Sequence, residues 1–177
     1  MSETLMLNYD GECQMKDIAH ASEWFCDCIE LHKLALFRFA KSILRNDEDA
    51  MDAVSEAITI AFAKLNTLRD RDKFKPWIMR ILANESYKIC NARKRMVSIE
   101  DIDNVAANDS FDDTLMLWSA VEALSDDLRS VVVLFYYEDF SVREISKVLD
   151  ISQGAVKTRL SRARGKLRLI LNNEEDM

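Results

Sequence analysis

The sequence predicts an all-α protein made of two small helical domains, and three observations support this fold class. The 177 residues include 3 glycines and 1 proline, whereas an all-β sandwich or barrel needs a turn about every eight to twelve residues. Apolar residues recur three to four positions apart through most of the chain, which is the spacing of a helix face. An acidic stretch without periodicity, residues 97–113, separates the two helical parts as a linker would.

The first predicted helix spans residues 22–44. Residues 1–20 are weakly patterned, so we expect a frayed or lightly packed N-terminal extension before the first domain, residues 21–96. The apolar positions of the helix are numerous enough for burial on more than one side: Trp24, Phe25, Ile29, Leu31, Leu34, Ala35, Phe37, Phe39, Ala40, Ile43 and Leu44. Arg45 then ends the helix, and Asn46 or Asp47 can cap the next one.

A second helix is predicted over residues 48–65. Its apolar stripe is expected to face the core and consists of Met51, Val54, Ala57, Ile58, Ala61, Phe62 and Leu65. The opposite face carries Asp52, Ser55, Glu56 and Thr59. Periodicity alone favours a solvated face there, and an acidic docking face for a basic partner is the alternative.

A basic helix follows a polar loop at residues 66–73. Pro76 suits the first turn of a helix, and the helical pattern continues to residue 95, with a break allowed near Asn84. Residues 73–95 carry one acid, Glu85, and seven bases: Lys73, Lys75, Arg80, Lys88, Arg93, Lys94 and Arg95. Trp77 is expected in the core. The basic side chains can neutralise the phosphates of a nucleic acid, and Asn84 and Tyr87 add groups that can contact its nucleotide bases. The alternative is that the Lys and Arg side chains are merely solvated.

The second domain, residues 114–173, is predicted to hold several short helices and one long one. Ser125 is expected to cap a helix that runs to about residue 136, with acids in its first turn. Ser141 and Glu144 form a capping box for the next, short helix. After a tight turn, Ser152 caps a last helix that reaches residue 171.

Residues 141–168 have the pattern of a helix-turn-helix. The inner face of the last helix is apolar, and Gly154 in its first turn leaves room for a phosphate. Its outer face is polar and basic: Lys157, Thr158, Arg159, Ser161, Arg162, Arg164, Lys166 and Arg168. Six bases without a neighbouring acid predict salt-dependent attraction to DNA. The alternative is a basic helix that binds an acidic protein or is merely solvated.

The charge is segregated, so the net value of −7 does not argue against DNA binding. The linker carries acids alone: Glu100, Asp101, Asp103, Asp109, Asp112 and Asp113. No run of 18 apolar residues and no basic, apolar leader is present, so we expect a cytoplasmic protein that does not insert into a membrane.

Composition and motifs also argue against an enzyme, a cofactor or a small-molecule substrate. The sequence has no glycine-rich phosphate loop, no Ser-His-Asp order and no standard metal-ligand spacing. Cys13, Cys26 and Cys28 lie near His20 and His32, yet this spacing matches no standard structural zinc site. We therefore predict ordinary thiols, neither a metal site nor a redox sensor.

Three stretches together resemble the extracytoplasmic-function (ECF) sigma factors, the small two-domain initiation subunits of bacterial RNA polymerase. Residues 121–168, VEALSDDLRSVVVLFYYEDFSVREISKVLDISQGAVKTRLSRARGKLR, look like sigma region 4. Residues 47–62, DEDAMDAVSEAITIAF, are similar to region 2.2, and residues 74–95, FKPWIMRILANESYKICNARKR, to regions 2.3 and 2.4. The resemblance covers most of the chain in the order of the family.

The resemblance implies a function and a set of partners. The chain would dock on core RNA polymerase, at the β′ clamp and the β flap, and direct initiation at promoters with minus-ten and minus-thirty-five elements. Region 2 would melt the minus-ten element and region 4 would bind the minus-thirty-five element. An anti-sigma factor is a further expected partner. The acidic linker would thread through basic polymerase channels in place of nucleic acid.

The resemblance also assigns residues. Asp52, Ser55 and Glu56 match the core polymerase-binding positions. The minus-ten element would meet a base-capturing loop formed by Asn84, Glu85, Ser86, Tyr87 and Lys88. It would also meet the basic residues that follow the loop, Arg93, Lys94 and Arg95. The minus-thirty-five element would meet Lys157, Thr158, Arg159, Ser161 and Arg162, with Arg162 reading a guanine bidentately. The sequence departs from the family at Ser55, Ile58, Lys88 and Asn91.

Two other readings stay open from the sequence. A stand-alone helix-turn-helix transcription regulator would use residues 1–96 for sensing or dimerisation, although such a domain has no need of a basic, aromatic helix. A degenerate sigma factor that binds polymerase without reading promoters is compatible with the departures from the family.

Overall fold

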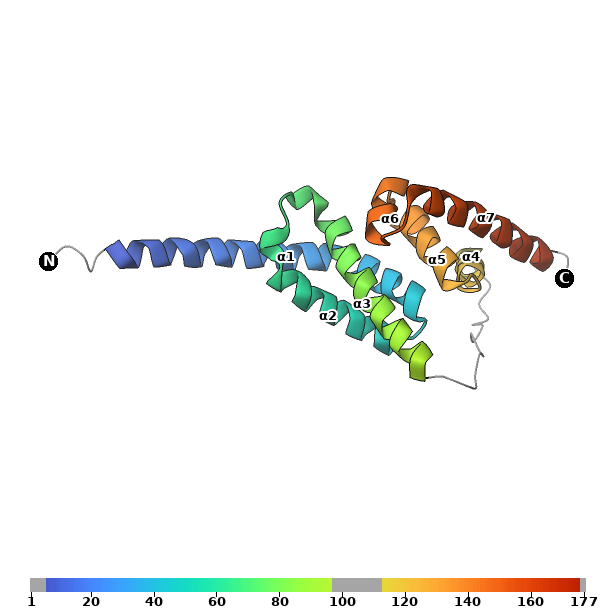
Figure 1. The fold of residues 1–177 in the computed structure, drawn as a ribbon, viewed down its shortest axis with the longest axis horizontal. Helices are drawn as coiled ribbons and strands as arrows, with labels where there is room; N and C mark the ends of the chain where they lie inside the picture. The colour runs from blue at the N-terminus through green and yellow to red at the C-terminus, as the bar shows by residue number, and fades with distance from the viewer. Residues whose placement is uncertain (1–5, 97–112, 176–177) are drawn as a thin grey trace.

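The computed structural model describes residues 6–96 and 113–175, so almost all of the predicted linker lies outside the described residues. Over those two ranges the chain forms helices and turns without a strand, which confirms the all-α prediction. Figure 1 shows α1–α3 as one group and α4–α7 as a second group beside it. Within these ranges no helix is both long and apolar enough to cross a bilayer.

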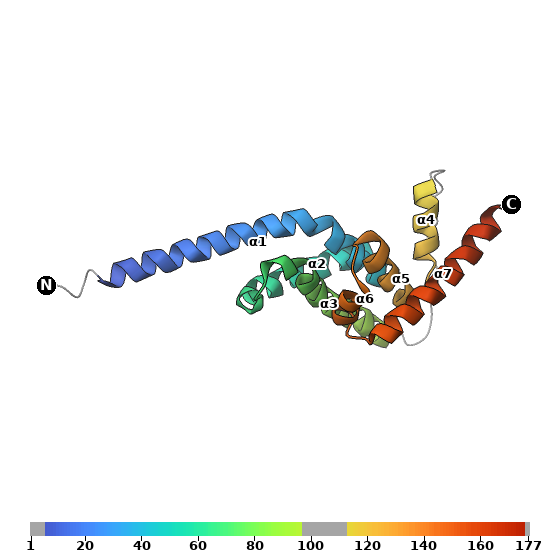
Figure 2. The same cartoon turned by 90° about the horizontal axis from the view of Figure 1, so that it is seen from above.

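Helix α1 spans Met6–Leu44 and is longer than the helix predicted over residues 22–44. Its N-terminal half extends away from the rest of the molecule (Figures 1 and 2). The expected frayed extension is therefore helical from Met6 onward. The end of α1 agrees with the prediction, because Arg45 adopts a left-handed backbone with φ of 61°. Asn46 then caps the next helix by accepting a hydrogen bond from the Asp49 amide at 3.0 Å.

Helix α2, Asp47–Ala63, packs against both α1 and α3. Its buried residues are all alanines: Ala50, Ala53, Ala57 and Ala61. Small side chains at one face allow close approach of helix backbones. The alanine face thus lets α2 pack closely against α1 and α3, which also pack against each other.

The predicted inward stripe of α2 is wrong at its two ends. Met51 is 61% exposed and Phe62 is 51% exposed. In α1, Leu31 and Leu34 were likewise expected to be buried and are exposed. The prediction followed the largest apolar side chains, whereas the buried contacts of α2 use its alanine face. Phe62 still packs one edge of its ring against Phe25 of α1, with centroids 5.4 Å apart.

Helix α3, Phe74–Met96, follows two short 3₁₀ turns at Leu65–Thr67 and Arg71–Lys73. The ring of Phe74 is buried and meets Trp24 and Phe25 edge-on, with centroids 5.4 and 5.7 Å apart. Trp77 packs against the same core, as predicted. The helix is unbroken at Asn84, so the base-capturing loop implied at residues 84–88 is helical here.

The C-terminal group contains α4 (Asp113–Glu122), α5 (Asp126–Val132), the π-helical turn η3 (Val133–Tyr137), α6 (Val142–Val148) and α7 (Gln153–Glu175). The predicted capping box is present: the Ser141 amide donates to Glu144 Oε2 at 3.0 Å, and the Glu144 amide donates to Ser141 Oγ at 3.3 Å. Ser125 stands at the N-cap of α5 but makes no side-chain capping bond. Helices α6 and α7 thus form the predicted helix-turn-helix.

Candidate nucleic-acid interface

Helix α7 is positioned by an apolar face and by its N-cap. Val156, Leu160 and Ala163 are buried against α5 and α6. Ser152 Oγ accepts a hydrogen bond from the Ala155 amide at 3.1 Å, as predicted for a cap. A Cβ added at Gly154 would meet only Ser152 Oγ, at 3.8 Å. Packing inside the protein therefore does not require glycine at this exposed position.

The predicted DNA-binding residues of α7 divide between open surface and an internal contact. Lys157, Thr158, Ser161 and Arg162 are exposed. Arg159 is partly buried and its guanidinium forms an ion pair with Asp127 at 3.3 Å. Four of the five predicted side chains are therefore available to a ligand, and Arg159 must first exchange its acidic partner.

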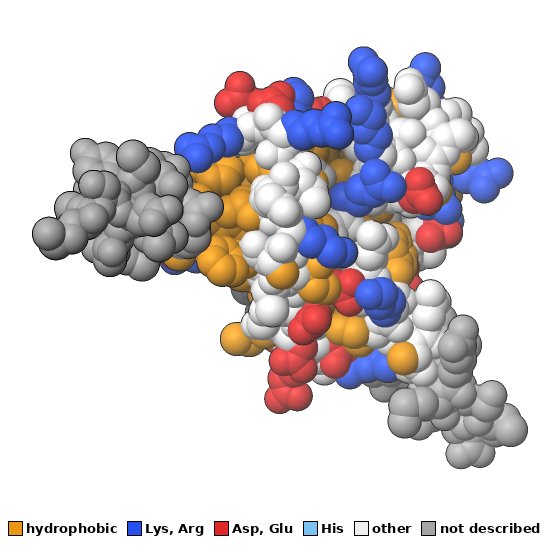
Figure 3. Space-filling view, turned by 60° about the vertical axis from the view of Figure 1, so that its left-hand side comes forward, with side chains coloured by type: hydrophobic (Ala, Val, Ile, Leu, Met, Phe, Trp, Pro, Cys, Tyr) orange, Lys and Arg blue, Asp and Glu red, His pale blue; other side chains and the backbone are white. Residues whose placement is uncertain are grey.

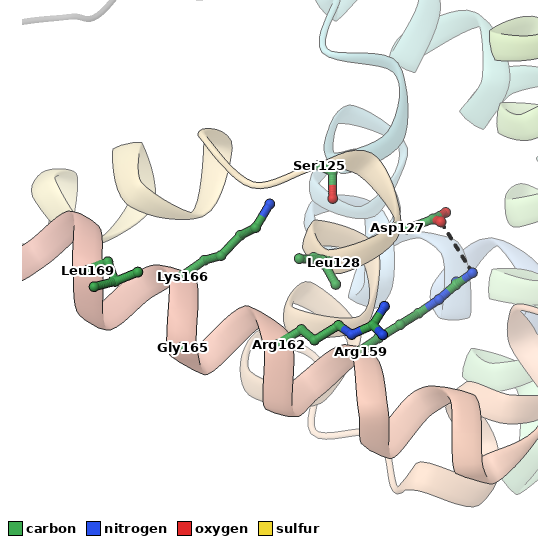
Figure 4. Close-up of a pocket in the computed structure, with 8 residues that line it drawn as sticks. All are labelled: Ser125, Asp127, Leu128, Arg159, Arg162, Gly165, Lys166 and Leu169. Carbon is green, nitrogen blue, oxygen red and sulfur yellow. Dashed lines mark hydrogen bonds and ion pairs between the residues drawn. The ribbon is translucent and has the colours of Figure 1, made fainter.

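A hollow of about 540 Å³ lies between α7 and the start of α5. Figure 4 shows Arg162 and Lys166 projecting from α7 on the side that faces Ser125 and Leu128, with the Asp127–Arg159 ion pair at one end. Leu169 adds a second apolar side chain to the lining. The hollow thus combines guanidinium and ammonium groups with apolar walls.

A second hollow, of about 380 Å³, lies between α2 and α3. Asn84, Glu85 and Lys88 line it from α3, together with Lys64 from the end of α2 and Asn91. The ammonium group of Lys88 donates to Glu85 at 2.7 Å. The arrangement offers amide and charged groups around a space with apolar walls from Ile60 and Ile81.

The other minus-ten candidates are less accessible. Ser86 is fully buried, and its hydroxyl has no hydrogen-bond partner in the described part of the chain. Tyr87 is half-buried, and burial raises the pKa of its hydroxyl above the usual value, while Ser130 of α5 acts in the opposite direction. Arg93 pairs with Asp49 at the start of α2. The side chains of Lys94 and Arg95 lie outside the described residues.

The predicted polymerase-binding residues share one exposed face of α2. Asp52, Ser55 and Glu56 are all exposed, and the Ser55 hydroxyl donates to the Met51 carbonyl at 2.9 Å. Met51 and Phe62 add exposed apolar groups to the same helix. The sequence analysis missed these two residues, although positions 51, 55, 58 and 62 follow helical spacing.

Charged side chains of both signs are exposed on the face in Figure 3. Lys and Arg side chains are most numerous over its upper part, and Asp and Glu side chains occur both there and lower down, beside exposed hydrophobic ones. No group of three or more His, Cys, Asp or Glu side chains in the described ranges could hold a metal ion.

Comparison with known proteins agrees with this two-part architecture. The family model for sigma-70 region 2 matches residues 28–96, and the model for sigma-70 region 4 matches residues 114–167. The chain is 30% identical over 152 residues to RNA polymerase sigma factor SigV of Bacillus subtilis, covering 84% of this chain and 91% of that protein. It is 27% identical over 162 residues to the ECF sigma factor SigW of the same organism, covering 81% of this chain and 87% of that protein.

Two solved structures resemble the whole chain. The sigma factor RpoE in complex with the anti-sigma factor NepR from Bartonella quintana has a TM-score of 0.65 and 28% identity, covering 82% of this chain and 97% of that one. CnrH in complex with the cytosolic domain of CnrY has a TM-score of 0.60 at 24% identity, covering 89% of this chain and 97% of that one. The second likeness concerns the fold alone.

A helical bundle followed by a helix-turn-helix with a basic second helix is the architecture of a promoter-reading subunit. The chain belongs to the extracytoplasmic-function family of RNA polymerase sigma factors. Its function is therefore that of an alternative sigma factor, which directs transcription initiation. The match to region 2 argues against a stand-alone helix-turn-helix regulator, because such a protein needs no second sigma domain.

Proposed function

We propose that three surfaces of this sigma factor divide the work of initiation within the cytoplasm. The exposed face of α2 docks on the β′ clamp of core polymerase, the hollow beside Asn84 captures a base of the minus-ten element, and α7 binds the minus-thirty-five element. The single observation that supports this most is α7 itself, whose apolar face is buried while Lys157, Thr158, Ser161 and Arg162 remain exposed.

Docking through α2 is supported by its mixture of acids and apolar side chains. Asp52 and Glu56 supply negative charge for a basic partner, and Met51 and Phe62 supply apolar area that would otherwise stay in water. In the C-terminal domain, the hollow lined by Leu128 and Leu169 offers apolar walls to the β flap.

Base capture beside Asn84 is supported by the chemistry of the lining. The Asn84 amide both donates and accepts, so it can pair with a base edge. Extruding a base costs a few kcal/mol, which hydrogen bonds and phosphate contacts offset. Since residues 84–88 are helical here, the side chains, rather than a loop, would have to receive the base.

An anti-sigma factor is also proposed as a partner. The solved relative RpoE is in complex with the anti-sigma factor NepR. The apolar surface on α2 and the hollow beside α7 are accessible to such a regulator in the free chain. A regulator that covered both would compete with polymerase for the same groups.

Reconstitution tests the DNA-reading surfaces. Purified protein is mixed with bacterial core polymerase and fragmented genomic DNA of its source, and transcript starts are sequenced. We expect starts that share a two-part promoter, and a loss of about tenfold or more for Arg162→Ala, because a bidentate guanine contact contributes about 1–3 kcal/mol. Arg168→Ala, an exposed base on the same helix, is the matched control.

Asn84→Ala is expected to lower the yield of promoter-specific transcripts without changing association with core polymerase. Asn66→Ala, at an exposed asparagine outside the hollow, serves as its control.

Docking through α2 is tested separately. Asp52→Lys with Glu56→Lys should abolish co-migration with core polymerase, whereas Glu23→Lys on α1 should not. Association without promoter-specific starts would indicate a degenerate sigma factor. Equal effects of the test and control variants would refute the assigned surfaces.

A further inference from the structure

One residue of the turn η3 remains at the surface. The amide of Glu138 donates to the Val133 carbonyl, five residues back, at 3.1 Å, which is the bond of a π-helical turn. Such turns are often found at functional sites. Tyr136 is 50% exposed, whereas the other four residues of η3 are buried or partly buried. Tyr136 is therefore a surface side chain on a turn that its neighbours anchor in the core.

Tyr136 is connected to α7 by a hydrogen bond between two exposed side chains. Arg164 Nε donates to the Tyr136 hydroxyl oxygen at 2.8 Å. Because the hydroxyl accepts this bond, its own proton is left to donate to another group. Among the side chains that the structure describes, Arg164 has no ion pair and Tyr136 has no acceptor. The pair therefore has one hydroxyl proton and the terminal NH groups of a guanidinium left for a ligand.

Arg164 lies on the same stripe of α7 as two residues proposed to meet DNA. Lys157, Ser161 and Arg164 are exposed, and their spacing of four and three positions places them on one face of the helix. Arg159 lies on another side and is paired with Asp127 at 3.3 Å. The stripe that includes Arg164 is thus a flank of the DNA-reading helix whose cations are not bound to an acid within the described residues.

The dimensions of the major groove bring such a flank against phosphates. An α-helix with its side chains is about 10–12 Å across, and the major groove of DNA is about 12 Å wide. When a recognition helix reads base edges, its flanks therefore lie along the sugar-phosphate walls of the groove. Phosphate oxygens accept hydrogen bonds from guanidinium groups and from tyrosine hydroxyls. A paired arginine and tyrosine on this flank match that ligand.

We propose that Tyr136 and Arg164 together bind one phosphate beside the minus-thirty-five element, so that η3 as well as α7 contacts the promoter. This inference rests on the proposed role of α7. The bond between the two side chains holds Arg164 before DNA arrives, so less conformational freedom is lost on binding. A phosphate carries no sequence information. The pair therefore strengthens binding and positions α7, while the base preference depends on Arg162.

Tyr136→Phe tests the hydroxyl by itself. Its matched control is Tyr137→Phe, at a neighbouring tyrosine whose ring packs against Trp118 with centroids 5.3 Å apart. Reconstituted holoenzyme is titrated with a promoter taken from its own transcript starts. We expect Tyr136→Phe to bind about tenfold more weakly, as loss of a hydrogen bond to a charged group causes, and the control to match the wild type. The preferred minus-thirty-five sequence should stay the same, in contrast to Arg162→Ala.

Arg164→Gln tests the charge. The slope of the logarithm of the binding constant against the logarithm of salt concentration should become shallower by about 0.9, the value for one phosphate. Arg69→Gln, at an exposed base between α2 and α3, should keep the wild-type slope. Neutral methylphosphonate linkages, placed one at a time along the minus-thirty-five duplex, then locate the phosphate. At one position the linkage should weaken binding by the wild type and have no further effect with Arg164→Gln.

Three results would overturn the pair and leave the proposed function standing, provided that Arg162→Ala still weakens promoter binding. The first is an equal loss with wild type and Arg164→Gln at every methylphosphonate position. The second is a lower thermal stability of Tyr136→Phe with unchanged promoter binding, which would make the bond purely structural. The third is weaker co-migration with core polymerase in either variant. Wild-type holoenzyme without promoter-specific starts would instead contradict both the pair and the proposed function.

Discussion

Single hydrogen bonds at helix starts decide where the C-terminal helices begin. Ser141 and Ser125 both occupy N-cap positions with extended backbones, yet only Ser141 makes a capping bond. Its bonds to Glu144 also lower the pKa of that carboxyl. The two serines can therefore be compared as an N-cap residue that makes a side-chain capping bond and one that makes none.

Replacing these serines should give unequal losses of stability. Ser141→Ala is expected to lower the free energy of unfolding by about 1 kcal/mol, the usual loss for a working N-cap. Ser125→Ala should cost less than half of this, because its hydroxyl caps nothing in α5. Urea denaturation followed by circular dichroism measures both, and equal losses would contradict the assigned caps.

His32 reports the electrostatics beside the Glu138 carboxylate and the Lys75 ammonium. Burial and the nearby Lys75 ammonium lower the pKa of its imidazole below the usual 6.5, while Glu138 acts in the opposite direction. The folded protein therefore prefers the neutral ring. Below about pH 6.5 the unfolded chain binds more protons than the folded one, so this contribution to stability is lost as the pH falls towards the folded pKa.

The chain has only two histidines, so a titration of imidazole resonances by NMR can be assigned with a His20→Asn variant. We expect a midpoint for His32 below 6.5. Lys75→Met should move that midpoint upward, because it removes the nearby positive charge. A midpoint at or above 6.5 in the wild type would be the contrary result.

At the scale of the element, α2 has two faces with different tasks. The alanine face packs against α1 and α3, whereas Met51 and Phe62, beside that face, are more than half exposed. Small apolar side chains are thus buried while larger ones on the same helix reach solvent.

Substitutions on the two faces of α2 should separate stability from binding. Ala57→Leu is expected to destabilise the protein by about 1–3 kcal/mol, since no room exists for the added carbons. Met51→Gln should change stability by less than about 0.5 kcal/mol while weakening association with core polymerase. Thermal unfolding and co-migration with core polymerase distinguish these effects, and a large stability loss in Met51→Gln would place that face in the core.

At the scale of the whole molecule, acidic and basic residues are concentrated in different segments of the chain. The chain carries a net −7, yet its last helix is basic and the acids concentrate in residues 97–113. Replacing the acids of this segment with their amides should leave association with core polymerase intact and lower the yield of promoter-specific transcripts, since a neutral chain no longer resembles a polyanion in a basic channel. Unchanged yields would show that the segment acts only as a tether.

Local features of the fold could be predicted from the sequence. The turns at Arg45 and at residues 139–141, the cap at Ser152 and the basic face of α7 depend on residues within one helical turn of each other, and short-range hydrogen bonds and spacing determine them. The start of α1 at Met6 was missed because residues 1–20 lack a clear apolar period.

The sequence by itself determined the helical class, the order of the helices, the segregation of charge and the family, because composition, spacing and local motifs carry these. The tertiary structure alone decided which face of α2 is buried, and it placed Glu138 against Arg38, one hundred positions away in the chain. Periodicity describes one helix at a time, whereas close packing selects among several apolar faces by shape. A buried ion pair between domains forms only when separate helices bring its partners together, so no local pattern could have predicted it.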